Sequence, residues 1–285
     1  MDLANRTRIV GLLHPGAMGV TVGATLRAGG ADVVWASAGR SDASRARAEE
    51  AGLRDVGDLA ALVDAADWIV SVCPPDAAER LAAEVARLGF GGTYCDANAV
   101  APARTLAMQA LISAAGADYV DGGIVGPPAA RPGTTWLHLS GPGADVMVPA
   151  FASGPLAAVV VSDRVGDASA LKMCYAAFTK GSTALLAAQL ACAQALGVRS
   201  ALEAQWERDE PGSSGAAAAR LRRVTAKAWR FEGEMHEIAA TFAASDLPVG
   251  FHAAAAEIYA RLAGFRRQPG APSLEQVLEA LLARE

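Results

Sequence analysis

Short apolar runs and longer amphipathic runs alternate along the first half of the chain. Short apolar runs that end at Gly, Pro or polar residues predict strands, and runs with apolar residues three to four positions apart predict helices. Strands are predicted at 8–13, 32–36, 68–73, 92–96, from 118 onward, at 135–140 and at 158–161, and helices at 17–28, 45–51, 77–88 and 105–115. This alternation predicts a parallel, doubly wound sheet of the Rossmann type.

The pattern changes after Ser162. Apolar residues recur with a helical period from 167 to 196 without a proline, and at about 1.5 Å per residue such a helix is about 45 Å long. A polar loop is predicted at 208–215, followed by helical segments at 216–244 and, after a break at 247–250, up to 264. The last helix is predicted to open at Ser273, because Gln276 three residues later completes a capping box.

We therefore predict an α/β protein with two domains. Residues 1–163 are expected to form a dinucleotide-binding Rossmann domain, and residues 164–285 an all-α domain that serves substrate binding and dimerisation. The long helix at 167–196 is expected to connect the two, and no internal repeat is visible.

Composition excludes several classes of protein. Of the 285 residues 52% are hydrophobic, which is enough for a sizeable core and argues against disorder. The net charge is −5, and the densest basic segment, at 220–227, is interpreted as the solvated face of a helix. A nucleic-acid partner is therefore not expected.

The cysteines and the N-terminal segment indicate the compartment. The four cysteines are far apart and form no C-x-x-C pair, which predicts buried thiols in a reducing cytosol rather than disulfides or a zinc site. The four histidines are equally scattered, so no metal site is expected. The polar segment 1–8 lacks the apolar stretch of a signal peptide, and the helical segments carry charges throughout. We expect a soluble cytoplasmic protein that does not contact a membrane.

A glycine-containing loop follows the first predicted strand and precedes a helix. Small residues in this position let the backbone approach a pyrophosphate, whose charge lies at the helix N-terminus. His14 stands where the G-x-G-x-x-G fingerprint has its first Gly, whereas Gly16 and Gly19 hold the other two positions. The alternative is an ordinary turn between a strand and a helix. The residues predicted to contact the cofactor here are Gly11, His14, Pro15, Gly16, Ala17 and Met18.

The end of the second strand predicts which nicotinamide cofactor is bound. Proteins that bind NAD usually place Asp or Glu there to bond the ribose 2′-hydroxyl, but this chain has no carboxylate before Asp42. Arg40, with the hydroxyls of Ser37 and Ser41, can instead hold a 2′-phosphate. The sequence therefore predicts that NADP(H) is preferred over NAD(H), although Arg and Ser are also common in loops without any such role.

These segments together resemble the β-hydroxyacid dehydrogenases, which include 6-phosphogluconate and 3-hydroxyisobutyrate dehydrogenases and are related to the imine reductases. The loop at 11–19 is similar to the family's G-x-x-G-x-G-x-M-G, the third strand ends in a proline at 74, and Asp96, Asn98 and Pro102 match a D-x-[ST/N]-x-x-x-P element. The resemblance covers nearly the whole chain. It implies that Cys73, Pro74 and Asn98 contact the cofactor.

The resemblance also implies a substrate loop and a catalytic lysine. The family's D-A-P-V-S-G-G aligns with 121–127, where Val125 replaces the Ser that helps to bind a carboxylate, and the D-G-x-I pattern looks closer to imine reductases. Ile124, Val125 and Gly126 are therefore expected to contact substrate. The family's catalytic motif aligns with 166–176, where Lys172 is retained but Ala176 replaces the Asn.

Lys172 is expected to act as the general acid/base of a hydride-transfer reaction. Burial at the domain interface would lower its pKa, although a lysine on an amphipathic helix can also simply extend to solvent. Tyr175, one helical turn further on, is interpreted as a replacement for the missing polar group. Trp229 and His236 are interpreted as walls of the substrate pocket or, equally, as a helix face packed on a partner.

Three functional hypotheses follow. The first is an NADP-dependent dehydrogenase that acts on a small hydroxy or keto substrate with Lys172. The second is an imine reductase-like enzyme that reduces a C=N bond, and the third is a non-catalytic dinucleotide-binding sensor. The resemblance, the long helix and the Ala-rich faces further predict a homodimer in which C-terminal helices pack on the partner's Rossmann domain.

Overall fold

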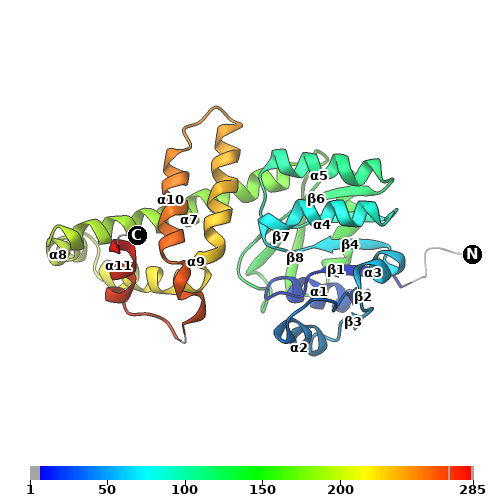
Figure 1. Cartoon of the computed structure of the whole chain (residues 1–285), viewed down its shortest axis with the longest axis horizontal. Coiled ribbons are helices and arrows are strands. Elements are labelled where there is room, and N and C mark those ends of the chain that lie inside the picture. The colour runs from blue at the N-terminus through cyan, green and yellow to red at the C-terminus, as the bar shows by residue number, and fades with distance from the viewer. Residues whose placement is uncertain (1–6, 269, 284–285) are drawn as a thin grey trace, which may run out of the picture. The chain divides into compact units, whose positions relative to one another are not determined.

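The computed structural model describes residues 7–268 and 270–283, and its N-terminal part is a single twisted sheet with helices on both faces (Figure 1). The strands are β1 (Ile9–Leu13), β2 (Asp32–Trp35), β3 (Arg54–Asp55), β4 (Trp68–Ser71), β5 (Thr93–Asp96), β6 (Asp118–Val125), β7 (Thr135–Ser140) and β8 (Leu156–Ser162). Their order in the sheet is β3-β2-β1-β4-β5-β6-β7-β8. The strand order reverses between β1 and β4, which is where ligands bind in doubly wound sheets.

Within the described residues, seven helical segments belong to this part of the chain. They are α1 (Gly19–Ala28), α2 (Asp42–Glu50), α3 (Leu59–Ala65), α4 (Pro75–Arg87), α5 (Pro102–Ala114), α6 (Ala144–Met147) and the short 3₁₀ helix η2 (Val148–Phe151). Side chains from α1, α2, α6 and η2 pack in one buried cluster on one face of the sheet, and those from α3, α4 and α5 pack in another on the opposite face. The predicted doubly wound fold is thereby confirmed.

Some details of the sheet differ from the sequence prediction. All strand pairs are parallel except β6 with β7, which is antiparallel. The pattern of the sequence did not indicate this one antiparallel pair, which arises because the connection at 126–134 is short and a parallel return would need a longer crossover. β6 also extends to Val125, so residues 121–125 are a strand rather than a loop. The short elements β3, α3 and α6 were not predicted, and α1 begins at Gly19 rather than at residue 17.

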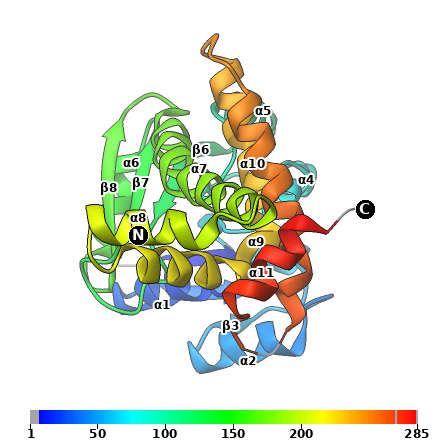
Figure 2. The same ribbon diagram turned by 90° about the vertical axis from the view of Figure 1, so that its left-hand side faces the viewer.

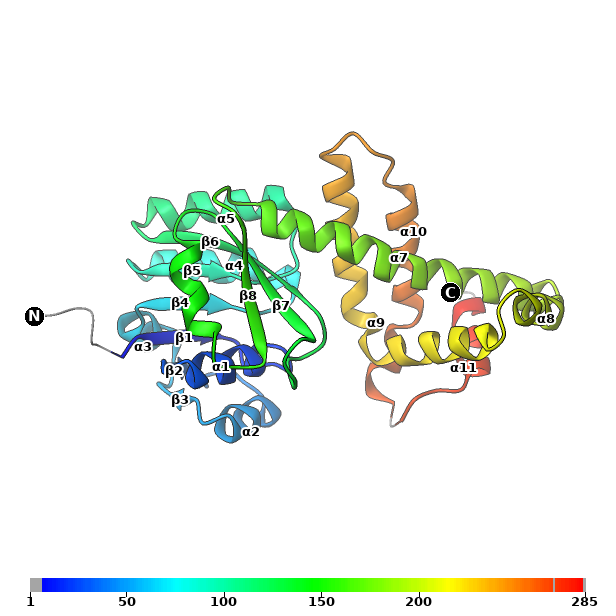
Figure 3. The same cartoon turned by 180° about the vertical axis from the view of Figure 1, so that it is seen from behind.

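The C-terminal part of the chain is helical, as predicted (Figures 2 and 3). Its elements are α7 (Asp167–Ala195), α8 (Arg199–Asp209), α9 (Ser213–Ala243), α10 (Gly250–Arg261), the 3₁₀ helix η3 (Ala263–Arg267) and α11 (Leu274–Leu282). The predicted capping box is confirmed, since the side chains of Ser273 and Gln276 each bond the other's backbone N–H. The predicted loop at 208–215 is shorter in the structure, because α8 reaches Asp209 and α9 starts at Ser213.

The chain separates into two compact units, one ending at Met173 and the other beginning at Cys174. The division falls inside α7, whose first turns therefore belong with the sheet. No described helix has the length and apolar character that crossing a membrane requires.

Candidate active site

The loop between β1 and α1 has the close backbone packing that a phosphate site needs. A Cβ atom at Gly19 would collide with the His14 carbonyl oxygen, so only glycine fits there. A Cβ at Gly16 would meet nothing within 4 Å, which leaves open space beside this loop. Within the described part of the chain, the N–H groups of Ala17 and Met18 donate to no acceptor. Unpaired N–H groups at the start of a helix are an anion-binding arrangement.

His14 places an imidazole rather than a cation beside this loop. The side chain is half-buried, and burial, with the nearby charges of Arg40 and Arg80, lowers the pKa of His14 to about 4. The ring is therefore neutral at neutral pH. The His14 N–H donates to the Val72 carbonyl at 3.2 Å, which ties the loop to the end of β4.

Three basic side chains near the ends of β1, β2 and β4 lie close enough to influence one another's charge. We call His14, Arg40 and Arg80 the basic cluster. Arg40 is half-buried, and burial followed by the charge of Arg80 lowers the pKa of its guanidinium, although Cys73 and Glu84 act in the opposite direction. Its Nε atom is buried and has no hydrogen-bond partner among the described residues. Arg80 lies on α4, and no local sequence signal connects it with Arg40.

The two serines predicted beside Arg40 have structural partners. The Ser37 N–H donates to an Asp55 carboxylate oxygen at 3.2 Å, and the Ser37 side chain is buried. Ser41 is the N-cap of α2, where its hydroxyl accepts from the Ser44 N–H at 3.3 Å. Both residues thus fix the loop that presents Arg40.

Asn98 joins the ends of β4 and β5. Its Oδ1 atom accepts from the Cys73 N–H at 2.5 Å, and its Nδ2 atom donates to Ser71 Oγ at 3.0 Å and to Asp96 Oδ2 at 2.9 Å. The Asn98 side chain is buried and uses its hydrogen-bonding capacity within the protein. It therefore shapes the turn that ends at Pro74, the N-cap of α4, rather than presenting a free amide.

Two groups beside Asn98 have shifted pKa values. Burial raises the pKa of Asp96 to about 7, against the hydrogen bonds from Asn98. Burial, with the charge of Asp96, raises the pKa of Cys73 to about 12, so this thiol stays protonated and is not a nucleophile.

Lys172 lies on the first turns of α7, which pack directly on β6. A Cβ atom at Gly123 would lie 2.7 Å from the Ala168 carbonyl oxygen and 2.9 Å from the Lys172 Cβ, so glycine allows this close approach. Lys172 Nζ donates to the Ile124 carbonyl oxygen at 2.7 Å. The ammonium group is therefore held at the carboxyl end of β6.

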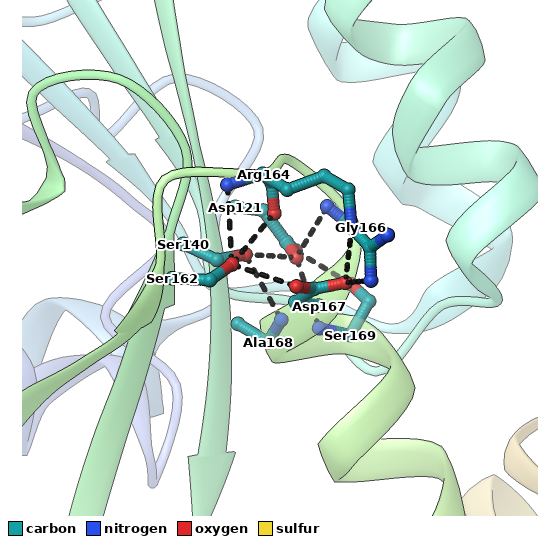
Figure 4. A network of polar contacts seen from close by, with 8 residues as sticks. All are labelled: Asp121, Ser140, Ser162, Arg164, Gly166, Asp167, Ala168 and Ser169. Atoms are coloured by element: carbon teal, nitrogen blue, oxygen red, sulfur yellow. Dashed lines mark hydrogen bonds and ion pairs between the residues drawn. The ribbon is translucent and has the colours of Figure 1, made fainter.

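A buried polar network, which we call the Asp121 network, fixes the start of α7 (Figure 4). Asp121 Oδ2 accepts from Ser140 Oγ at 2.9 Å and from the N–H groups of Gly166 and Ser169 at 3.0 and 2.9 Å. Its Oδ1 accepts from Ser169 Oγ at 2.6 Å, and Ser140 Oγ accepts from the Ala168 N–H at 2.9 Å. A carboxylate at a helix N-terminus is favoured by the helix dipole as well as by these bonds.

Of the residues predicted to bind substrate, Ile124 and Val125 point to opposite faces of β6, and Gly126 follows the end of the strand. Val125 lies on the same face of β6 as Asp121 and Gly123, because side chains alternate along a strand. The Ile124 side chain packs in the core on the opposite face, so only its carbonyl reaches Lys172. Gly126 has φ of 128°, and a Cβ there would collide with the Thr134 carbonyl, so it ends the strand sharply.

The remaining predicted residues, Tyr175, Trp229 and His236, belong to the second unit. Tyr175 is 51% exposed, and His236 on α9 is also exposed. Trp229 is half-buried beneath the guanidinium of Arg266, 3.7 Å from its ring centroid. Their roles in substrate binding stay predictions.

Comparisons with known proteins were made on the sequence and on the fold. A family model described as a domain of unknown function (DUF1932) matches residues 193–262, which lie in the helical part of the chain. No curated protein sequence matches the chain.

Solved structures share the fold over nearly the whole chain. A conserved protein of unknown function, MTH1747, whose structure is described as similar to 3-hydroxyacid dehydrogenases, is 26% identical, covers 90% of this chain and 98% of its own, and has a TM-score of 0.65. The 3-hydroxyisobutyrate dehydrogenase of Mycobacterium tuberculosis, solved with L-serine, is 16% identical with a TM-score of 0.70 and coverages of 98% and 100%. An imine reductase variant from Myxococcus stipitatus, in complex with NAD⁺, is 20% identical with a TM-score of 0.55 and coverages of 98% and 100%. The predicted resemblance is thus confirmed: the structural neighbours are dehydrogenases and imine reductases.

Proposed function

We propose that the protein is an NADP-dependent oxidoreductase that transfers a hydride between the nicotinamide and a small hydroxy or keto substrate. The observation that best supports this proposal is that the loop between β1 and α1 and the Lys172 ammonium lie at the same edge of the sheet. The strands β1, β2, β4, β5 and β6 are all parallel, so the groups that follow them lie at the same carboxyl-end edge. Ligands of doubly wound sheets bind at this edge.

Lys172 is proposed as the general acid/base of this reaction. Its ammonium gives a proton to the substrate oxygen during reduction, and its neutral amine takes that proton back during oxidation. The bound cofactor supplies or accepts the hydride. The Ile124 carbonyl and the Asp121 network hold the lysine in place, so that its proton is delivered at one position.

The preference for NADP(H) is supported by the basic cluster. The half-buried Arg40 guanidinium has an unpartnered Nε among the described residues and has a second guanidinium, Arg80, as a neighbour. A 2′-phosphate would provide both the missing acceptor and the missing negative charge. Arg is suited to this role because its planar donors match phosphate oxygens.

An imine reductase-like activity is the second candidate. Val125 occupies the strand position where the family's hydroxy-acid enzymes carry a carboxylate-binding Ser, so an uncharged substrate is favoured at this point. A reductive aminase from Aspergillus terreus, solved with NADPH4, cyclohexanone and allyl amine, has the same fold, with 18% identity and a TM-score of 0.54. Ketones and cyclic imines are therefore the substrates to test beside hydroxy acids.

We further propose that the helical region assembles as a homodimer. Apolar side chains are exposed along α7, with Phe178 at 78% and Leu185 at 56%, and Leu196, directly after the helix, is 71% exposed. A helix that is apolar on opposite sides is normally covered on both. A second copy is the proposed cover, and light scattering of wild type and Phe178→Glu tests it: a dimer that the variant dissociates is expected, and a wild-type monomer at micromolar concentration contradicts it.

Cofactor binding tests the central part of the proposal. NADPH and NADH are titrated against wild type, Arg40→Ala and the control Arg87→Ala, which removes an exposed arginine from the far end of α4. We expect NADPH to bind tighter than NADH, and Arg40→Ala to weaken NADPH binding by about 10- to 100-fold, the value of a charge-assisted hydrogen bond, with NADH unchanged. Failure of wild type to bind either cofactor rejects the oxidoreductase function.

A further inference from the structure

One face of β7 points towards the start of α7. Leu137 and Leu139 are fully buried in the core of the opposite face, so the alternate residues Trp136, His138 and Ser140 point the other way. Ser140 confirms this direction, because its hydroxyl accepts from the N–H of Ala168 in α7. His138 is the next residue along this face and is half-buried.

Strand register places His138 beside Lys172. His138 is the direct partner of Gly123 across the antiparallel β6–β7 pair, and directly opposed residues project to the same face about 5 Å apart. A Cβ atom at Gly123 would lie 2.9 Å from the Lys172 Cβ. Ala168 is bonded to Ser140, and Lys172 lies one helical turn after Ala168. His138 lies next to Ser140 on the same face of β7, so the two pairs of residues run side by side.

The burial of His138 and the charges around it determine its protonation state. Burial, followed by the charge of Lys172, lowers the pKa of His138 from its usual value of 6.5. The other ionisable groups on this side are Asp121 on β6, held by its network, and Asp167 at the start of α7, which is paired with Arg164. The residue opposite His138 on β8 is Val159, which carries no charge. The imidazole is therefore neutral at neutral pH and has a cation as its charged neighbour.

We propose that His138 is a positioning residue that acts through Lys172. As a neutral imidazole it leaves the ammonium in its bond to the Ile124 carbonyl; once protonated, it repels the ammonium and favours the neutral amine. Protonation of His138 thereby makes the Lys172 ammonium a stronger acid, which gives up its proton more readily. This inference rests on the proposed role of Lys172 as general acid/base, and it makes the lysine's reactivity depend on the charge of a strand residue that no motif marks.

The small number of lysines makes a direct test possible. The chain has only three, Lys172, Lys180 and Lys227, so competitive acetylation with mass spectrometry follows each one separately. The labelling of Lys172 relative to Lys227 is measured from pH 5 to 9 in wild type, His138→Gln, which cannot be protonated, and His138→Arg, which stays charged. In wild type we expect the ratio to rise about threefold as pH falls through the His138 titration, equal to about half a pKa unit of coupling. We expect a flat ratio in His138→Gln and a high one at every pH in His138→Arg.

A reciprocal NMR titration keeps the result independent of activity. The chain has four histidines, and the resonance missing in His138→Gln identifies His138. Lys172→Met should raise the pKa of His138 towards 6.5, whereas Lys227→Met should not. A wild-type ratio that stays flat, or one that rises equally in His138→Gln, overturns the proposal. NADPH binding by the same samples is a separate readout: coupling without binding rejects the oxidoreductase function alone, and binding without coupling rejects the role of His138 alone.

Discussion

The two halves of the carboxyl-end edge differ in how completely their polar groups are paired. At β6, both oxygens of Asp121 accept hydrogen bonds, and the donors come from β7 and α7. At the ends of β1 and β2, the Arg40 Nε and the N–H groups of Ala17 and Met18 have no acceptor among the described residues. A fully paired network fixes the positions of its side chains, whereas unpaired donors around a cation form a site that can bind an anion. We infer that the protein itself completes the lysine half and that a ligand completes the nucleotide half.

The largest loss of stability is expected when Asp121, the acceptor at the centre of its network, is removed. Asp121→Ala leaves the Ser140 and Ser169 hydroxyls and two N–H groups without their acceptor, and should lower the free energy of unfolding by about 4 kcal/mol. Urea denaturation measures this. Asp145→Ala, at an exposed position of α6, is the matched control and should change it by less than about 0.5 kcal/mol. Equal stability of the two variants would show that the network does not hold α7.

A smaller loss is expected from the packing of α7 on β6. In Gly123→Ala the new methyl group meets the Ala168 carbonyl and the Lys172 Cβ, and overpacking of this kind costs about 2 kcal/mol. Gly233→Ala is the control, because a Cβ there meets nothing within 4 Å and alanine favours a helix. Calorimetry should show a lower melting temperature for Gly123→Ala and an unchanged or higher one for Gly233→Ala; the same change in both would contradict the close approach.

The raised pKa of Asp96 leads to a prediction of how the free energy of unfolding depends on pH. Its pKa is about 7 in the folded protein and near 3.8 in the unfolded chain, so the folded state binds the proton more tightly. The stability from this group is full below about pH 4 and is lost as pH rises towards 7. Between pH 5 and 8 wild type should therefore lose on the order of 2 to 3 kcal/mol relative to Asp96→Asn. Asp118→Asn, at the exposed start of β6, should follow wild type, and parallel curves for Asp96→Asn and wild type would refute the shift.

The smallest effect concerns the outer member of the basic cluster. Arg80 is exposed, so Arg80→Ala should weaken NADPH binding by only about threefold, and added salt should remove much of the difference. Arg87→Ala on the same helix is the control. A larger loss than in Arg40→Ala would exchange the roles of the two arginines.

The sequence predicted the fold well because its long elements have strong periods. The helix expected at 167–196 is α7, and the cap at Ser273 was visible locally. β3, with two residues, is too short to show a period, and the antiparallel direction of β7 depends on a loop whose course the pattern does not show.

The candidate site was predictable only where a motif is local. Arg40 and Lys172 stood out in their segments, but Arg80 and His138 become relevant only through neighbours far along the chain. The contact of Asn98 with a cofactor stays a prediction, whereas the bonds of its amide to Cys73, Ser71 and Asp96 could not be read from the sequence. Hydrogen bonds between strand ends are set by the sheet order, which a single sequence does not specify.

The most direct test of the central claim is turnover with and without Lys172. Wild type and Lys172→Met are supplied with NADPH and a panel of ketones and cyclic imines, and with NADP⁺ and hydroxy acids, while the nicotinamide absorbance is followed. We predict turnover by wild type and at least about a 100-fold loss in Lys172→Met, with NADPH binding unchanged, as expected for a general acid that does not hold the cofactor. Turnover by Lys172→Met at the wild-type rate would contradict the account, and NADPH binding by wild type without turnover of any substrate would favour the dinucleotide-binding sensor.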